Sequence, residues 1–409
     1  MAATTTIDRE SVTQEGFYVP RFEVHVNGVG LPQDVIRDVI SLTYKDSIKE
    51  IDSFEMTVAN WDPVEFDHKY IGARTETKKV LDDKSSHQSQ LFHLFEPCNH
   101  AVEVKLGYAG TLRTMLSGNF TTMEPSFTNS GAPILTVRGL NVLHQLRRKQ
   151  YTTAFAGKKP SEIAVELGNL RDKGQKRFPL PVKIDDQAKA DEDKIDIVTQ
   201  KNQYDVDFLF VLARSFGYVV YVIEADTKKG IPRSLYFGPS DSNHPGTRDV
   251  TFQLERGKSI IDFKPKLTTA NQIKSVTVRG WHRTRKTLIT RTVTLDDERI
   301  NVNKDLHRIL NACDAREELV VDEPIFTNCE ARERAIAILL DQSKQMVTAT
   351  VRVVGLPDLR AGQIVVIGNV GARLSGRYFV TKSKHTIDDN GYITEFDCRR
   401  EQYVGGGTP

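Results

Sequence analysis

The sequence predicts a mainly β protein that is interrupted by a module of helices and strands. Short segments in which apolar and polar residues alternate recur in the first third and the last third of the chain, and this alternation is typical of half-buried strands. The middle third instead shows apolar residues at helical spacing. Hydrophobic residues make up 39% of the 409 residues, which is enough for packed cores, and the length predicts two or three domains.

The first β unit is expected at residues 17–150, after a flexible N-terminal arm at residues 1–16. It closes with a short helical segment around Val142, Leu143 and Leu146. Residues 64–100 lose the alternation and carry mixed charge, so they are interpreted as an insertion or long loop on the surface. The predicted strands of this unit are at 22–26, 39–44, 54–58, 101–106, 111–124 and 134–139.

Residues 151–245 are predicted to form a small α+β module. A first helix begins at Pro160, where the missing N–H has no cost, and a second is expected to be capped by Asp205 and to end at Gly217. A strand at 218–223 and its partner at 235–237 follow. The apolar faces of the two helices consist of Ile163, Ala164, Leu167 and Leu170, and of Phe208, Leu209, Leu212 and Phe216.

The second β unit is expected at residues 246–403, followed by a flexible tail at residues 404–409. One helix interrupts it and begins at a capping box formed by Thr327 and Glu330. Its apolar stripe consists of Ala331, Ala335, Ile338 and Leu339. The predicted strands are at 273–280, 348–354, 362–367, 378–381 and 392–396, and the last of them follows a hairpin turn at Asp389, Asn390 and Gly391.

A short internal echo links the two predicted β units. The sequence Thr-Val-Arg-Gly stands at 136–139 and again at 277–280, each time within a β-rich segment. Repeated sequence is the usual trace of a duplicated structural unit. The echo therefore supports a duplication, although periodicity does not say whether the units are barrels or sandwiches.

Charge and composition argue against several function classes. The chain has 56 Lys+Arg and 54 Asp+Glu, a net charge of +2, which removes the field of an extended nucleic-acid-binding face. Its longest apolar runs are too short to span a bilayer, and its N-terminus lacks the features of a secretory signal. Without a Cys-x-x-Cys pair, the cysteines are interpreted as free thiols of a soluble chain in a reducing compartment; they are Cys98, Cys313, Cys329 and Cys398.

The sequence shows none of the common catalytic or nucleotide-binding motifs, so no catalytic, cofactor-binding or metal-binding residue is predicted, no cofactor is expected, and the chain is predicted not to be an enzyme. His93, Cys98 and His100 share one segment and are interpreted as a polar loop rather than a metal site. The basic clusters at 147–149 and 281–286 are interpreted as solvated turns or protein-interface charges rather than phosphate contacts.

Several segments, taken in order, resemble the phage late control protein D family. This family comprises the baseplate hubs of contractile tails and is related to the hub part of VgrG proteins and of extracellular contractile injection systems. The usual glycine of the family is replaced by Cys98, so the local turn is expected to differ, and residues 64–91 are not matched. The matching segments are 52–62 (DSFEMTVANWD), 94–108, 118–127, 136–139, 143–144, 161–164, 205–209, 216–218, 272–281, 356–362, 376–381, His385, 391–392 and 395–396.

The resemblance implies a fold with two tail-tube-like β-barrel domains per chain and the α+β insert between them. Three copies would then present six similar units and form a pseudo-sixfold trimeric ring. Such a ring matches a hexameric inner tube on one side and keeps threefold symmetry for a trimeric spike on the other. Each contact around the ring would be heterologous and would close by rotation.

The resemblance also implies partners and a location. The expected role is a structural baseplate hub, with a homotrimer, the tail-tube protein, a spike protein and other baseplate proteins as partners, and with no specific nucleic acid and no stable membrane insertion. Because the sequence stops at residues 403–409, directly after the last hairpin, the spike is expected to be a separate polypeptide. The chain would be synthesised in the cytoplasm and assembled into the baseplate of a phage tail or phage-tail-like particle.

Two other function classes stay open at this point. A baseplate-associated cell-wall hydrolase would use carboxylates such as Glu50 and Asp52 as acid and base. A nucleic-acid-binding module would use the cluster at 281–286, with Trp281 stacking on bases.

Overall fold

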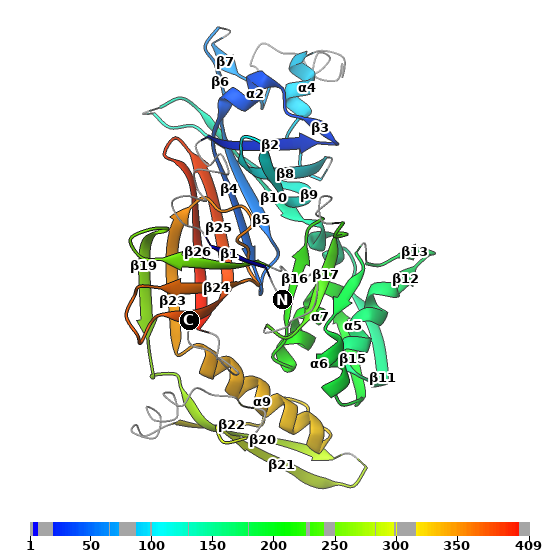
Figure 1. Ribbon diagram of the computed structural model, residues 1–409. Helices are drawn as coiled ribbons and strands as arrows, with labels where there is room; N and C mark the ends of the chain where they lie inside the picture. The colour runs from blue at the N-terminus through cyan, green and yellow to red at the C-terminus, as the bar shows by residue number, and fades with distance from the viewer. Residues whose placement is uncertain are drawn as a thin grey trace.

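The computed structural model describes the chain from residue 3 to residue 400 with gaps, and shows a mainly β protein (Figure 1). In that view the first β unit lies at the top, the second at the left and the α+β module at the right, while a three-stranded sheet crossed by a long helix lies at the bottom. The tail predicted at residues 404–409 lies outside the described residues. These are 3–6, 19–64, 66–72, 87–98, 100–129, 131–178, 180–225, 230–240, 250–282, 284–297, 300 and 316–400.

One 14-stranded sheet contains the strands of both β units. The strands of the first unit are β2 (Pro20–Val26), β3 (Val29–Gly30), β4 (Val39–Ser47), β5 (Ser53–Ala59), β8 (Ala101–Tyr108), β9 (Thr111–Ser126) and β10 (Ile134–Asn141). Those of the second unit are β18 (Val250–Glu255), β19 (Ile260–Leu267), β23 (Val347–Val354), β24 (Ile364–Gly368), β25 (Gly376–Asp388) and β26 (Gly391–Arg400). The main path runs β18-β24-β25-β4-β5-β10-β9-β8-β2-β3, and β26, β23 and β19 branch from β25.

Alternation along the strands builds the core of each unit, as the sequence predicts. In β5, Phe54, Met56 and Val58 are buried while the residues between them are partly exposed. The same pattern places Leu42 and Tyr44 of β4 in the first core. A separate hydrophobic cluster fills the second unit. All the strands predicted for the first unit are confirmed.

The segment predicted as a surface insertion, residues 64–100, contributes in part to the first core. It contains β7 (Asp67–His68), which pairs with β6 (Trp61–Asp62), and α4 (His87–His93). Tyr70 and Phe95 are fully buried and their rings lie 5.2 Å apart. The interpretation as a surface loop is therefore wrong for these residues, because burial of two aromatic rings stabilises the segment against the core. The short helix α2 (Gln33–Asp38) was not predicted.

The N-terminal arm also differs from its prediction. Ala3–Thr6 form β1, which pairs in parallel with β18 at the edge of the large sheet. The prediction of a flexible arm is wrong for these residues, whose threonine-rich sequence has a high strand propensity but is too short to show a period. The rest of the predicted arm lies outside the described residues.

The α+β module packs three helices with short sheets around its own hydrophobic cluster. Its helices are α5 (Pro160–Asn169), α6 (Asp186–Asp191) and α7 (Asp205–Ser215), and the 3-10 helix η1 (Val142–Arg147) precedes them. Its strands are β11 (Tyr151–Lys158), β12 (Arg171–Asp172), β13 (Gln175–Lys176), β14 (Val182–Ile184), β15 (Ile195–Gln203), β16 (Val219–Ile223) and β17 (Ser234–Gly238). The predicted pairing of β16 with β17 is confirmed and is antiparallel.

The predicted helix faces of this module are largely confirmed, and one cap is not. Phe208, Leu209 and Leu212 are buried, and the chain leaves α7 at Gly217 with a φ of +68°. The N-cap of α7 is Tyr204, so the prediction of Asp205 as the cap is wrong. The reason is an ion pair: the Asp205 carboxylate accepts hydrogen bonds from Arg177 and from Gln200 instead.

A second module lies between β19 and β23. It consists of β20 (Ile273–His282), β21 (Thr287–Thr294), β22 (Arg316–Val320) and α9 (Asn328–Lys344), and it has its own hydrophobic cluster. The helix α9 begins at the predicted capping box and lies across the sheet (Figure 1). The predicted unit at 246–403 therefore holds two hydrophobic clusters. The described helices include none that is both long enough and apolar enough to cross a membrane.

The echo of Thr-Val-Arg-Gly does not mark equivalent strands of two duplicated units. Residues 136–139 lie in β10 of the large sheet, whereas residues 277–280 lie in β20 of the three-stranded sheet. Both glycines serve local packing. A Cβ on Gly139 would lie 2.2 Å from the Phe54 ring, and a Cβ on Gly280 would lie 2.4 Å from the carbonyl oxygen of Ile325. The echo is thus no support for a duplication.

Candidate functional site

The long strand β25 joins the two β units. Its first half pairs with β24 of the second unit, and after a register shift at Val380 its second half pairs with β4 of the first unit. Residues 382–387 lie opposite residues 42–47 in this second pairing. The region where the two units meet is the candidate functional site, because it determines how the units are held relative to each other.

A buried ion pair lies at the centre of this region. The Nε atom of Arg360, from the loop before β24, lies 2.8 Å from Oδ2 of Asp46 in β4. The Nη2 atom of Arg360 donates to the main-chain oxygen of Met115 at 2.8 Å and to the hydroxyl of Tyr44. Burial opposes the charge of Arg360, but the neighbouring Tyr44 and Asp46 outweigh it and raise the pKa of the guanidinium above its ordinary value.

A second set of hydrogen bonds surrounds His385 of β25. Its Nε2 atom lies 2.9 Å from the main-chain oxygen of Leu359, and its Nδ1 atom lies 2.9 Å from the Tyr392 hydroxyl and 3.1 Å from Thr394 Oγ1. Ser383 bridges the two sets, because its hydroxyl donates to Asp46 and lies 3.1 Å from His385 Nε2. Burial lowers the pKa of His385 to about 4, so the imidazole is neutral at pH 7.

We call the set formed by Tyr44, Asp46, Arg360, Ser383, His385 and Tyr392 the polar joint. All six residues are buried. Buried polar groups that are hydrogen-bonded to one another restrict a packed interface to one arrangement. The polar joint can therefore hold the two β units in one relative orientation.

The sequence did not predict the polar joint. Arg360, His385 and Tyr392 all lie in segments that carry the family resemblance, but no role was assigned to them. Asp46 was missed. Its signal was present, because Leu42, Tyr44 and Asp46 alternate along β4 and put a carboxylate on the inward face of a strand.

The α+β module contacts the first unit through Arg233, which also forms a partly buried ion pair with Glu224 inside the module. Arg233 Nε lies 2.9 Å from Oε2 of Glu224, and Arg233 Nη2 donates to the main-chain oxygen of Ser117 in β9. Burial raises the pKa of Glu224. Because the contact crosses between units, it helps to position the module beside the large sheet.

A polar cavity of about 370 Å³ lies where α7, β16, α9 and β22 meet. Four of its charged side chains form two pairs: Arg334 Nε lies 2.7 Å from Glu323 Oε2, and Arg399 Nη1 lies 3.3 Å from Asp341 Oδ1. The cavity thus combines both signs of charge. This lining favours contact between the modules over binding of a strongly charged ligand.

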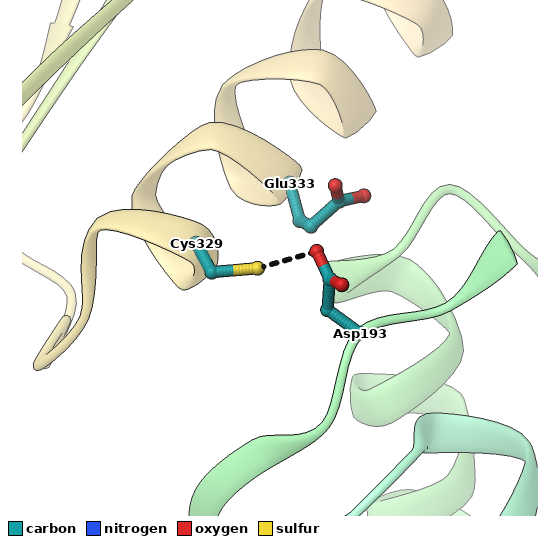
Figure 2. A group of neighbouring side chains, drawn as sticks. All are labelled: Asp193, Cys329 and Glu333. Atoms are coloured by element: carbon teal, nitrogen blue, oxygen red, sulfur yellow. Dashed lines mark hydrogen bonds between the residues drawn. The ribbon is translucent and has the colours of Figure 1, made fainter.

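Figure 2 shows a group of three potential metal ligands that the sequence did not reveal. Cys329 and Glu333 stand one turn apart on α9, and Asp193 reaches them from the loop between α6 and β15. Their ligand atoms lie within 4.8 Å of one another, and the Cys329 thiol donates to Asp193 Oδ2 at 2.9 Å. Carboxylates and thiols do bind divalent cations. The spacing of Cys329 and Glu333 was the only sequence signal.

The carboxylates considered for a hydrolase are placed differently from an acid–base pair. Asp52 is buried, and its Oδ2 atom accepts a hydrogen bond from Asn141 Nδ2 at 2.9 Å. Glu50 is exposed. Asp52 thus anchors η1 to the β4–β5 turn and does not present an accessible acid or base.

The segment of His93, Cys98 and His100 is held by hydrogen bonds to its own main chain and to Asn27. The two ring nitrogens of His100 lie 2.7 Å from Asn27 Nδ2 and 2.8 Å from the main-chain oxygen of His93. Cys98 has a φ of +65°, the left-handed conformation that favours glycine. The turn therefore keeps a glycine-type backbone although the residue is cysteine.

The two basic clusters have different surroundings. Arg147 forms an ion pair with Asp207 at 2.8 Å, and Lys149 forms one with Asp172 at 2.7 Å. These charges are therefore neutralised within the chain. Trp281 in the second cluster is 52% exposed and lies beside the turn of the β20–β21 hairpin. Residues 388–391 form the predicted hairpin turn between β25 and β26.

A family model described as the Alg8 N-terminal domain matches residues 82–389. The chain belongs to this family. The Alg8 N-terminal domain match runs from just before α4 to the turn after β25, and so includes Arg360 and His385 of the polar joint. No curated protein matches the sequence.

Solved structures of similar fold cover nearly the whole chain. A prophage MuSo2 tail protein from Shewanella oneidensis has 14% identity and a TM-score of 0.60 over 93% of this chain and 98% of that protein. A tail protein from Neisseria meningitidis has 15% identity and a TM-score of 0.61 over 94% and 97%. A type VI secretion system component from E. coli has 11% identity and a TM-score of 0.51 over 94% and 79%. These likenesses confirm the resemblance to baseplate hub proteins at the level of the fold.

Proposed function

We propose that this chain is a structural baseplate hub of a contractile injection machine. The observation that carries the proposal is the extent of the fold likeness, since the chain and each of the two tail proteins cover at least 93% of one another. In this role the chain is a non-enzymatic component of a phage tail or phage-tail-like particle.

The proposed assembly is a homotrimer that acts as a symmetry adaptor. Each chain contributes two β units, which we propose to be tail-tube-like barrels, so three chains present six similar units to a hexameric inner tube. The opposite side of the ring keeps threefold symmetry for a separate trimeric spike. Supporting this geometry, β4 and β25 join the two units edge to edge and the polar joint holds them in one orientation.

In such a machine the polar joint would keep the two β units in a fixed orientation while force is transmitted through the hub. A hub that passes load from tube to spike must not bend between its two β units. Removing one partner of a buried ion pair costs about 3–5 kcal/mol because the other charge stays buried without its partner, so the Asp46–Arg360 pair favours the one arrangement of the units in which both partners are in contact.

Co-expression tests the proposal. The full chain is produced with the tube subunit and the spike protein of the same particle, and complexes are measured by native mass spectrometry and electron microscopy. The expected result is three copies of this chain with three spike chains, bound at one end of a sixfold tube. A chain that binds neither protein, or that binds with two or six copies, would contradict the adaptor.

A further inference from the structure

In the three-stranded sheet the β20–β21 hairpin is basic and the segment that contains β22 is acidic. The hairpin from 273 to 294, which contains β20 and β21, has six Lys or Arg residues and no Asp or Glu. The segment from 316 to 323, which contains β22, has four Asp or Glu residues and one Arg. In the described part of the chain, none of the hairpin cations forms an ion pair; they are Lys274, Arg279, Arg285, Lys286 and Arg291.

Both outer strands of this sheet have a free edge among the described residues. The order is β21-β20-β22, so β21 and β22 each pair only with β20. The strand β21 has eight residues, pairs in continuous register and contains no proline or bulge. Neither a proline nor a bulge therefore blocks this edge, and such an edge is a template for a strand of another chain.

The strand directions permit the two edges to meet between copies. The strand β21 runs antiparallel to β20, whereas β22 runs parallel to β20. The strands β21 and β22 are therefore antiparallel to each other. Rotation about an axis that lies along the strands leaves their directions unchanged. β22 of a neighbouring copy would therefore approach β21 as an antiparallel partner, which is the more stable of the two pairings.

The charges favour pairing of β21 with β22 of the next copy over pairing of β21 with β21 of another copy. Arg291 lies opposite Val278, and Glu318 lies opposite Val276, so both side chains are on the same face of the sheet, one at each edge. Contact of β21 with β22 of the next copy brings Arg291 toward Glu318. A twofold contact of β21 with β21 would instead bring together two strands whose only charge is positive, which is destabilising.

We propose that β21 of one copy pairs with β22 of the next copy and that this head-to-tail contact closes the trimer. The inference rests on the proposed trimeric hub and names its ring contact. The contact is heterologous, so it repeats identically in every copy and leaves no free edge when the ring closes.

Charge reversal at each edge tests the contact in the full chain. The basic-edge variant is Lys286→Glu/Arg291→Glu, the acidic-edge variant is Glu317→Lys/Glu318→Lys, and the swapped variant carries all four substitutions. The matched control is Lys176→Glu/Lys201→Glu, at two exposed lysines of the α+β module. Analytical ultracentrifugation gives the dissociation constant of the trimer, and thermal melting confirms that each variant is folded.

The expected result is a trimer dissociation constant at least about tenfold higher for each single-edge variant, a wild-type value for the control, and recovery in the swapped variant. Wild-type trimerisation by the folded basic-edge variant, whose changes are at exposed positions, would overturn the inference and leave the trimeric hub standing. Failure of the swap to restore a folded trimer would also overturn it. A wild-type chain that stays monomeric at every concentration would overturn both proposals.

Discussion

Arg360 and Asp46 are 314 positions apart in the sequence and form a buried ion pair with 2.8 Å between Nε and Oδ2. The pair connects the loop before β24 to β4, and therefore connects the second β unit to the first. The Asp46 carboxylate also accepts from the Ala361 main-chain N–H at 3.2 Å and from the Ser383 hydroxyl. Because one carboxylate binds three groups from the second unit, the two units are expected to unfold together.

Replacing Arg360 with methionine should destabilise the protein by about 3–5 kcal/mol, since it leaves the Asp46 charge buried without its partner. The free energy of unfolding from urea titration followed by circular dichroism measures the loss. The matched control is Arg138→Met, which removes an arginine paired with Glu55 and Glu124 at the exposed surface and should cost about 0–1 kcal/mol. Equal effects of the two substitutions would show that the polar joint does not stabilise the fold.

Stability should fall as the pH is lowered from about 6.5 to about 4 because of His385. Its pKa is lowered from 6.5 to about 4 by burial, so between these values the unfolded chain binds a proton that the folded chain does not. The contribution of His385 to the free energy of unfolding is complete above pH 6.5 and is lost progressively as the pH falls to 4. This difference in pKa between the folded and the unfolded chain corresponds to about 3 kcal/mol of stability.

Urea titrations at pH 7, 6, 5 and 4.5 check this dependence. Since carboxylates titrate in the same range, the diagnostic quantity is the difference between wild type and His385→Gln, in which the amide keeps hydrogen-bonding capacity without a titrating ring. The wild type should lose more stability than the variant between pH 6 and 4.5. Parallel pH profiles for the two proteins would refute the assignment.

The sequence predicts most of the local structure because local patterns determine it. Period-two alternation identifies β5 and β10, and the capping box at Thr327 identifies the start of α9. The pairing of β25 with β4 could not be predicted, because it joins strands more than 300 residues apart and has no local signal. The polar joint depends on that pairing, so its members could be found singly but not as a group.

The prediction of Asp205 as a helix cap shows how tertiary contacts override local preference. Aspartate at a helix start normally accepts a hydrogen bond from a nearby backbone N–H. Here Arg177 and Gln200 engage the carboxylate, and the Arg177 guanidinium also stacks 3.5 Å from the centre of the Tyr151 ring. These partners come from other elements, so the sequence around Asp205 could not reveal them.

Replacing Leu212 with aspartate should destabilise the α+β module by several kcal/mol, in the range of about 2–5 kcal/mol for disruption of a packed core. Leu212 is 4% exposed and belongs to the module's hydrophobic cluster. The neighbouring Val211 is 47% exposed on the same helix, so Val211→Asp is the matched control and should cost less than about 1 kcal/mol. Thermal melting of both variants measures the difference. Unchanged melting of Leu212→Asp would mean that the buried face of α7 is misassigned.

Replacing Gly139 with alanine should destabilise the first β unit by about 1–3 kcal/mol, the usual cost of overpacking. A Cβ at Gly139 would lie 2.2 Å from the Phe54 ring and 2.6 Å from the main-chain oxygen of Asn119, and neither can move away. Phe54 is buried and packs edge-to-face on Phe120 at 5.6 Å, while Asn119 is fixed in the β9–β10 pairing.

The control for this packing argument is Gly131→Ala in the turn before β10. A Cβ there meets only the Thr128 hydroxyl, at 3.6 Å, so ordinary contact distances are kept. The substitution should leave stability unchanged or raise it by up to about 1 kcal/mol, because alanine has less conformational freedom than glycine in the unfolded chain. Urea titration compares the two variants with the wild type. If Gly139→Ala were tolerated as well as Gly131→Ala, close approach of Phe54 could not be the reason for glycine in β10.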